Sequence, residues 1–237
     1  MAKLIVALDV DSFAQARGLV ERLDGLDVWF KVGNEAFYSF GAELVAYLED
    51  GGRPYFLDAK LHDIPRTVAA GVRALVRPQA RIVSVHAIGG NEMMQAAVEA
   101  AAERAGELGV SVPEIYAVTI LTSIASEELR ELGLTGGPGE NVTRLAALAR
   151  DARCAGVVCS VHEARDLKSF FGTEFGALCP GIRPSGTAHG DQKRVASPRD
   201  AVAAGADYLV VGRPITEASD PAAAANAILV EMSGVHV

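Results

Sequence analysis

The sequence predicts an α/β protein that folds as one closed barrel of eight parallel strands alternating with helices, a TIM barrel. Three observations lead to this prediction. The chain has 237 residues, close to the length of about 250 residues that is typical of a single barrel of this kind. Half of its residues are hydrophobic (50%) and only 22% are charged, so it can bury a core. Short apolar runs recur along the whole chain and are separated by helical stretches.

Each apolar run is short enough for a strand and apolar enough to be buried on both faces, as strands of a parallel sheet are. In chain order, the expected strands are Leu4 to Leu8, Val28 to Val32, Tyr55 to Leu57, Ile82 to Val85, Ile115 to Leu121, Gly156 to Cys159, Phe175 to Cys179 and Tyr208 to Val211. Their number and spacing favour a closed barrel.

The helices between these strands have recognisable starts. Ser12 precedes FAQARGLVERL, Asn91 precedes EMMQAAVEAAAERA, Asn141 precedes VTRLAALARDA, and Ser197 is followed by Pro198. These are residues preferred at the N-cap, with proline favoured at the first helical position. An open doubly wound sheet is the alternative, but the glycine-rich turn that would follow its first strand is missing. We therefore expect a single barrel domain over residues 1–237.

Composition excludes several classes of function. The 22 basic residues are outnumbered by 30 acidic ones, giving a net charge of -8, the wrong sign for a surface that neutralises many phosphates of a nucleic acid. The N-terminal apolar run is interrupted by Asp9, so it is too short for a signal peptide or a membrane span. We expect a cytoplasmic protein that binds neither nucleic acid nor membrane.

Cysteine and histidine usage points away from metal chemistry. Cys154, Cys159 and Cys179 are odd in number and lack the spacing of metal ligands, so we expect buried free thiols in a reducing compartment. The five histidines form no pair with metal-ligand spacing. The sequence therefore predicts no zinc site.

Polar side chains gather where the expected strands end. They belong to Asp9, Lys31, Asp58, Lys60, His86, Thr122, Arg183 and Arg213, and Gly212 stands beside Arg213. The C-terminal ends of the strands of such a barrel meet at one mouth, where active sites are built. The alternative is that these are ordinary polar residues at loop edges, and His86 could equally be a hydrogen-bonded structural residue.

The segment from Phe56 to Pro65 places charges in an otherwise buried strand. Asp58 and Lys60 are two residues apart and should point to the same side. Together with Lys31 and Asp63 they form an alternating set that can neutralise itself. A structural network of ion pairs is the alternative. A lysine held between carboxylates should stay protonated, so it could donate a proton to a carbanion-like centre.

The opposite side of the mouth carries the features of a phosphate site. Arg183 follows the seventh strand, and Gly212 and Arg213 close the eighth. Loops at these two places are the usual phosphate site of the fold, and arginine binds phosphate with paired hydrogen bonds. We expect Gly212 to permit close approach of the backbone. The segment 185–192 reads as a mobile lid or, alternatively, as a solvated linker.

Several segments in the same order resemble the bacterial orotidine 5'-monophosphate decarboxylases, and the resemblance covers essentially the whole chain. The most specific match is FLDAKLHDIPRT, residues 56–67. The supporting matches are ALD (7–9), KVG (31–33), VHA (85–87), TILTS (119–123), PGIR (180–183), DQ (191–192) and VGR (211–213).

The resemblance implies a role for each matched residue. Lys60 would donate the proton to C6 of the pyrimidine, Asp58 would lie near the substrate carboxylate, and Lys31 would complete the charged array. Asp63 would reach into the site of the neighbouring subunit of a homodimer. The remaining residues would bind the nucleotide: Asp9 at the ribose, Thr67 and Thr122 on the nucleotide, and Arg183, Gln192, Gly212 and Arg213 on or near the phosphate.

The activity implied by the resemblance is decarboxylation of orotidine 5'-monophosphate to uridine 5'-monophosphate, in pyrimidine biosynthesis, without metal or organic cofactor. Two alternatives stay open. A related sugar-phosphate decarboxylase or aldolase would share the charged segment but use Mg²⁺, and the continuation through Ile64, Pro65, Thr67 and Gln192 disfavours it. A non-catalytic phosphate-binding barrel is disfavoured by the intact charged array.

Overall fold

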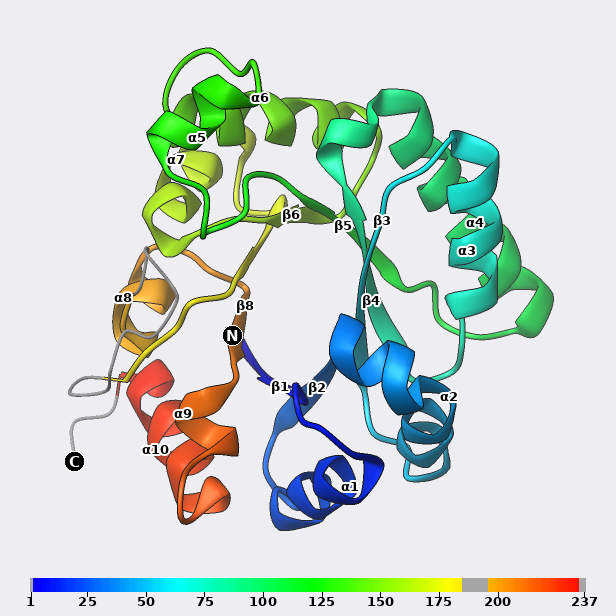
Figure 1. Ribbon diagram of the computed structural model, residues 1–237, viewed down its shortest axis with the longest axis vertical. Helices are drawn as coiled ribbons and strands as arrows, with labels where there is room; N and C mark the ends of the chain where they lie inside the picture. Colours follow the sequence, from blue (N-terminus) through cyan, green and yellow to red (C-terminus); the bar gives the residue numbers. More distant parts are fainter. Residues whose placement is uncertain (1, 185–195, 235–237) are drawn as a thin grey trace.

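A computed structural model of the protein describes residues 2–184 and 196–234, and over this part of the chain eight parallel strands form a closed barrel. The strands follow chain order around the barrel, and β1 closes the ring by pairing with β8. Helices surround the strands (Figure 1). The predicted TIM barrel is therefore confirmed.

The strands are β1 (Lys3–Ala7), β2 (Val28–Val32), β3 (Tyr55–Leu61), β4 (Ala80–His86), β5 (Glu114–Val118), β6 (Gly156–Val158), β7 (Gly176–Cys179) and β8 (Tyr208–Val211). The helices of the described residues are α1 (Phe13–Arg22), α2 (Asn34–Asp50), α3 (Pro65–Leu75), the 3₁₀ turn η1 (Ala87–Gly89), α4 (Asn91–Leu108), α5 (Ser126–Glu131), α6 (Pro138–Asp151), α7 (Val161–Phe171), α8 (Pro198–Ala203), α9 (Arg213–Thr216) and α10 (Pro221–Ser233).

Two strands differ in length from the prediction in a way that matters for the mouth of the barrel. β3 continues to Leu61, although the expected strand ended at Leu57, because Leu61 still pairs with Val85 of β4. β5 ends at Val118, although the expected strand ran to Leu121. The chain beyond Val118 then contributes to the rim of the mouth.

The helix starts are a mixture of confirmations and corrections. Ser12 and Ser197 are N-caps whose hydroxyls accept hydrogen bonds from Gln15 N and Asp200 N. Asn91 is instead the first residue of α4, because Gly90, with φ +86°, takes the capping position.

The predicted cap at Asn141 is also wrong. Pro138 starts α6 one turn earlier, with Gly137 as the N-cap, so Asn141 lies inside the helix. Its buried amide donates to the carbonyl oxygens of Thr135 and Gly137.

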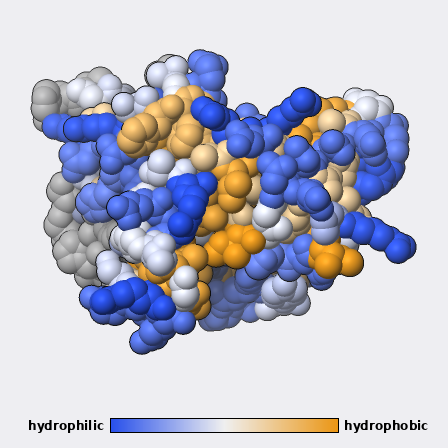
Figure 2. Space-filling model, turned by 90° about the horizontal axis from the view of Figure 1, so that it is seen from above, coloured by the Kyte–Doolittle hydropathy of each residue, from blue (hydrophilic) through white to orange (hydrophobic). Residues whose placement is uncertain are grey.

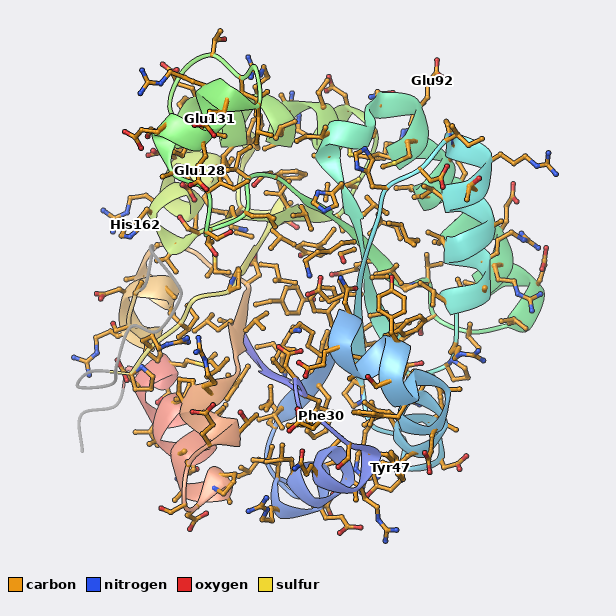
Figure 3. All side chains as sticks on the ribbon, viewed as in Figure 1. Phe30, Tyr47, Glu92, Glu128, Glu131 and His162 are labelled. Atoms are coloured by element: carbon orange, nitrogen blue, oxygen red, sulfur yellow. The ribbon has the colours of Figure 1, made fainter. Side chains whose placement is uncertain are left out.

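The interior of the barrel is packed with side chains and is not a channel. Strand residues that point inward form one apolar cluster: Ile5, Ala7, Phe56, Ile82, Tyr116, Leu178 and Val210. Side chains fill the centre of the ring in Figure 3. A second, larger cluster lies between strands and helices. Among the described residues, the inner cluster fills the barrel below the C-terminal ends of the strands, where a cavity opens.

Cys154, Cys159 and Cys179 are free and buried, as predicted. Burial raises the pKa of the Cys154 thiol to about 12, so this thiol is unreactive at neutral pH. Within residues 2–184 and 196–234 no helix is long and apolar enough to cross a membrane. Seen from the top of Figure 1, hydrophilic residues cover much of the surface and apolar residues are exposed near the middle of the view (Figure 2).

Candidate active site

A cavity of about 470 Å³ opens at the C-terminal ends of the strands. Its size is in the usual range of small-molecule sites, roughly 300 to 1,000 Å³. Inner-cluster residues form its floor: Ala7, Phe56, Leu178 and Val210. Eight of the residues predicted or expected at the mouth line its wall: Asp9, Lys31, Asp58, Lys60, Thr122, Arg183, Gly212 and Arg213. The strand ends thus converge as expected.

One side of the cavity holds a chain of alternating charges. Lys31 Nζ lies 2.9 Å from Asp9 Oδ1 and 3.6 Å from Asp58 Oδ2. Lys60 Nζ lies 2.6 Å from the same Asp58 oxygen. The side chains of Lys31 and Asp58 are each only 10% exposed, whereas that of Lys60 is 30% exposed. Asp58 therefore joins two ammonium groups, and that of Lys60 is the more open to the cavity.

Asp58 and Lys60 meet through a distortion of β3 and not through the regular alternation of a strand. Leu57 pairs with Val83 of β4 and Leu61 pairs with Val85, so three residues of β3 stand opposite one residue of β4. Lys60 has φ +47°, in the left-handed region that non-glycine residues rarely adopt. The prediction that the two side chains lie together holds, but its reason is corrected.

The charges around Asp58 keep it ionised. Burial by itself would raise the pKa of this carboxyl group, because it disfavours the charged form. The positive charges of Lys31 and Lys60, with hydrogen bonds from Lys60 and Ser84, outweigh burial and lower the pKa below its ordinary value. The site therefore presents a fixed negative charge between two lysines at neutral pH.

His86 lies at the end of β4, half-buried, with its ring centroid 5.6 Å from that of His62. Burial lowers the pKa of His86, and the charges of His62 and Lys60 lower it further. Its imidazole is therefore neutral at pH 7, and His86 is not part of the cavity wall.

The opposite wall carries the two arginines. Arg183 follows β7 and Arg213 follows β8, and both line the cavity together with Gly212. A Cβ at Gly212 would meet only Ala7 Cβ, at 3.7 Å, which is ordinary contact. Packing within the protein therefore does not require glycine at this position. The absence of a side chain at Gly212 leaves space in the cavity. Gln192 and the segment 185–192 lie outside the described residues.

Two predicted site residues do not line the cavity of their own chain. Asp63 and Thr67 are exposed. The Asp63 carboxylate accepts a hydrogen bond of 2.6 Å from the backbone N–H of Ile64, whose side chain is 65% exposed. Of the predicted site residues that the structure describes, the others line the cavity, whereas Asp63 and Thr67 face outward.

Sequence analysis missed several residues of the site. Glu35, Thr216 and Glu217 line the cavity from the start of α2 and from the end of α9. They lie beyond the strand ends that guided the prediction. Ser84 is fully buried in β4 and contacts both Asp58 and Lys60. Its only signal is a single hydroxyl in an apolar strand.

Gly33→Ala is expected to disturb the charged array while leaving the barrel stable. An added Cβ would lie 2.5 Å from Lys31 Nζ and 2.7 Å from Asp9 Oδ1, so both flexible side chains must move. We expect turnover to fall by roughly 10- to 100-fold, because a misplacement of about 1 Å can cost 100-fold. Gly18→Ala is the control, since nothing lies within 4 Å of its new Cβ. Equal activity in both variants would show that the array needs no such clearance.

Among the residues that the structure describes, no group of three or more His, Cys, Asp or Glu side chains could hold a metal ion. The carboxylates of Asp9 and Asp58 are instead partnered by lysines.

Comparison with known proteins identifies the family of this chain. A family model described as the orotidine 5'-phosphate decarboxylase / HUMPS family matches residues 2–228. The orotidine 5'-phosphate decarboxylase of Nitratidesulfovibrio vulgaris is 48% identical over 237 residues, covering all of both chains. That of Moorella thermoacetica is 47% identical over 234 residues, covering 98% of this chain and 93% of its own.

A solved structure shares the fold closely. The crystal structure of orotidine 5'-phosphate decarboxylase from Lactobacillus acidophilus superposes with a TM-score of 0.87 at 39% sequence identity, covering 98% of this chain and 99% of that one. The family model that matches residues 2–228, together with these relatives at 47 and 48% identity, shows that this protein belongs to the orotidine 5'-phosphate decarboxylase / HUMPS family.

Proposed function

We propose that this protein decarboxylates orotidine 5'-monophosphate to uridine 5'-monophosphate in pyrimidine biosynthesis, acting as a carboxy-lyase with Lys60 as the proton donor. The observation that carries the proposal is the Asp9, Lys31, Asp58 and Lys60 array on the wall of the cavity. Relatives at 46 to 48% identity that bear the name of this decarboxylase support the same activity.

The array suits a reaction that develops negative charge on carbon. The bond between C6 and the carboxylate breaks, CO₂ leaves, and the electron pair stays on C6. The Lys60 ammonium stabilises this charge and then transfers its proton to C6, after which water restores the proton to the lysine. Fixed charges in a site that excludes water stabilise such a transition state without reorganisation.

Asp58 has two parts in this proposal. It holds Lys60 through the 2.6 Å ion pair, and its ionised carboxylate lies beside the position proposed for the substrate carboxylate. Asp9 and Lys31, which are paired with each other at 2.9 Å, would bind the ribose and complete the charge balance. An ion-pair network with a structural role alone has no need to open into a cavity.

The phosphate is proposed to bind on the opposite wall, with Arg183, Gln192, Gly212 and Arg213, while Thr122 contacts the nucleotide. Binding energy from this remote group can then be used to favour the transition state at the ring.

Arg213→Ala is expected to weaken binding of phosphorylated substrates. A hydrogen bond to a charged group contributes about 1.5 to 3 kcal/mol, so kcat/KM for the nucleotide should fall roughly 10- to 100-fold. The phosphate-free nucleoside should be affected little, and Arg73→Ala, on an exposed ion pair, serves as control. An equal loss for both substrates would place Arg213 away from the phosphate.

We also propose a homodimer in which Asp63, and with it the exposed Thr67, reaches the site of the neighbouring chain. Both residues are exposed beside Ile64 and lie outside the cavity of their own chain. A twofold interface would create two shared sites.

The competing function in this family is that of a Mg²⁺-dependent enzyme acting on a sugar phosphate. The discriminating experiment incubates the purified protein with orotidine 5'-monophosphate and a chelator, and follows the loss of substrate absorbance. Turnover in the presence of the chelator supports the proposal. Turnover that needs added Mg²⁺ would favour the competing enzyme, and nucleotide binding without turnover would favour a non-catalytic barrel.

A further inference from the structure

Ser84 of β4 faces the bulge of β3, which is formed by residues 58–60. It is the single β4 residue opposite Asp58, Ala59 and Lys60, because the register pairs on either side are Leu57 with Val83 and Leu61 with Val85. Its own backbone is held in the barrel by its register with Tyr116 of β5. Ser84 lies two residues after the inward-facing Ile82, so its side chain is on the inner face. The hydroxyl is thus presented to the bulge from a fixed strand.

The hydroxyl makes two hydrogen bonds of 2.9 Å. It donates to Asp58 Oδ1 and accepts from the backbone N–H of Lys60. The other carboxylate oxygen, Asp58 Oδ2, accepts from Lys60 Nζ at 2.6 Å. The three residues therefore form a closed ring that ties the lysine at both its backbone and its ammonium.

This ring coincides with the strained residue of the site. The φ of +47° at Lys60 is strained for a non-glycine residue and persists only where its surroundings enforce it. The ladder between β3 and β4 is interrupted at this point, so its regular hydrogen bonds cannot enforce the conformation. The backbone N–H of Lys60 bonds instead to the Ser84 hydroxyl.

We infer that Ser84 is a positioning residue: its hydroxyl holds the Lys60 backbone in the left-handed conformation and the Asp58 carboxylate against the Lys60 ammonium, so that the ammonium is aimed at the reacting carbon. The inference deepens the proposed function and rests on it. Ser84 is fully buried and does not line the cavity, so it acts through Asp58 and Lys60 and not on the substrate.

The inference predicts a split between kcat and KM. Ser84→Ala removes one oxygen atom and both hydrogen bonds, so kcat for orotidine 5'-monophosphate should fall roughly 10- to 100-fold, the loss expected for a displaced catalytic group. KM should change less than about threefold, because the arginines and Asp9 are untouched. Ser84→Thr keeps the hydroxyl and should recover most of kcat. Ser84→Cys keeps a weak donor and acceptor and should fall between them.

Thr119→Val provides the matched control for a buried hydroxyl with a structural role. Thr119 is as buried as Ser84, but its hydroxyl donates to the backbone carbonyl of Val158 and does not contact the array. This variant should lower the midpoint of thermal unfolding and leave kcat per folded molecule unchanged.

A second readout is independent of turnover. The pKa of the Asp58 carboxyl group, followed by carbon NMR, should rise in Ser84→Ala because a hydrogen bond that favours the ionised form is lost, and should return toward the wild-type value in Ser84→Thr. The other groups around this carboxylate, Lys31, Lys60 and His86, are the same in all variants.

Either an unchanged kcat in folded Ser84→Ala or an equal loss in Thr119→Val would overturn the inference. An unchanged pKa of the Asp58 carboxyl group would do the same. Wild-type protein without any turnover would instead refute the proposed function, and the NMR measurement would still decide whether Ser84 holds Asp58. We expect Ser84→Ala to have a lower kcat with a preserved KM, and Ser84→Thr to recover most of kcat. The pKa of the Asp58 carboxyl group should change in the same order.

Discussion

Lys60→Ala is expected to reduce kcat/KM for orotidine 5'-monophosphate by about 10⁴-fold or more while the barrel stays folded. General acid catalysis contributes roughly 10²- to 10⁴-fold, and a fixed charge at the transition state roughly another 10²- to 10³-fold. Both are lost with this ammonium group. The side chain is 30% exposed at the cavity and is no part of either apolar cluster, so its removal leaves no cavity in the core.

Lys3→Ala is a closely matched control for this experiment. Lys3 is also a lysine at 2.6 Å from an aspartate oxygen, with 27% of its side chain exposed, but it stands at the start of β1, at the other end of the strands. Turnover should be normal in Lys3→Ala and nearly absent in Lys60→Ala, while both give circular dichroism spectra of a folded barrel. Near-normal kcat in Lys60→Ala would remove Lys60 from the mechanism.

Mixing two inactive variants should restore activity, because each shared site is proposed to take Lys60 from one chain and Asp63 from its neighbour. In a hybrid of Lys60→Ala with Asp63→Ala, one site carries both defects and the other carries neither. With equal amounts and random exchange, half of the dimers are hybrids and roughly a quarter of all sites are intact. Activity is measured after dissociation and reassociation of the mixture.

Each variant alone, taken through the same treatment, shows whether handling creates activity. Mixing Arg213→Ala with Lys60→Ala is a further control, because both residues line the cavity of a single chain. Each site of such a hybrid carries one defect, so no activity should return. A gain of activity in this mixture would mean that Arg213 acts across the interface. The contradicting result is no gain of activity in verified hybrids of Lys60→Ala and Asp63→Ala, when Asp63→Ala alone is severely impaired. It would mean that Asp63 works within its own chain.

Sequence alone could locate the charged array because the fold makes strand ends converge. Asp9, Lys31 and Asp58 belong to three successive strands or the turns after them, and β1, β2 and β3 are neighbours in the barrel. A parallel barrel in chain order leaves no other place for their side chains to meet. The two arginines after β7 and β8 follow from the same rule.

The bulge in β3 could not be predicted in this way. Strand periodicity assumes one residue opposite another, whereas here three residues of β3 face Ser84. The left-handed Lys60 has no sequence signal, because the conformation is enforced by a contact with another strand. The bulge therefore explains both why Ser84 was not predicted and why the reason for the pairing of Asp58 with Lys60 had to be corrected.

Helix starts were predicted where local chemistry decides them and missed where competing residues lie nearby. Ser12 and Ser197 cap their helices as expected. The cap predicted at Asn91 is taken by the preceding residue, Gly90. The cap predicted at Asn141 is wrong because Pro138, at the first helical position after Gly137, starts the helix earlier. The partner proposed for the outward-facing Asp63 is a second chain, whose contacts a single sequence does not describe.

The most direct test of the central claim measures both products of orotidine 5'-monophosphate turnover in D₂O, with a chelator present. The purified protein should release CO₂ and uridine 5'-monophosphate in equal amounts, with one deuterium at C6 of each uridine 5'-monophosphate molecule and no loss of rate on chelation. Absence of uridine 5'-monophosphate, or activity that disappears with the chelator and returns with Mg²⁺, would contradict it.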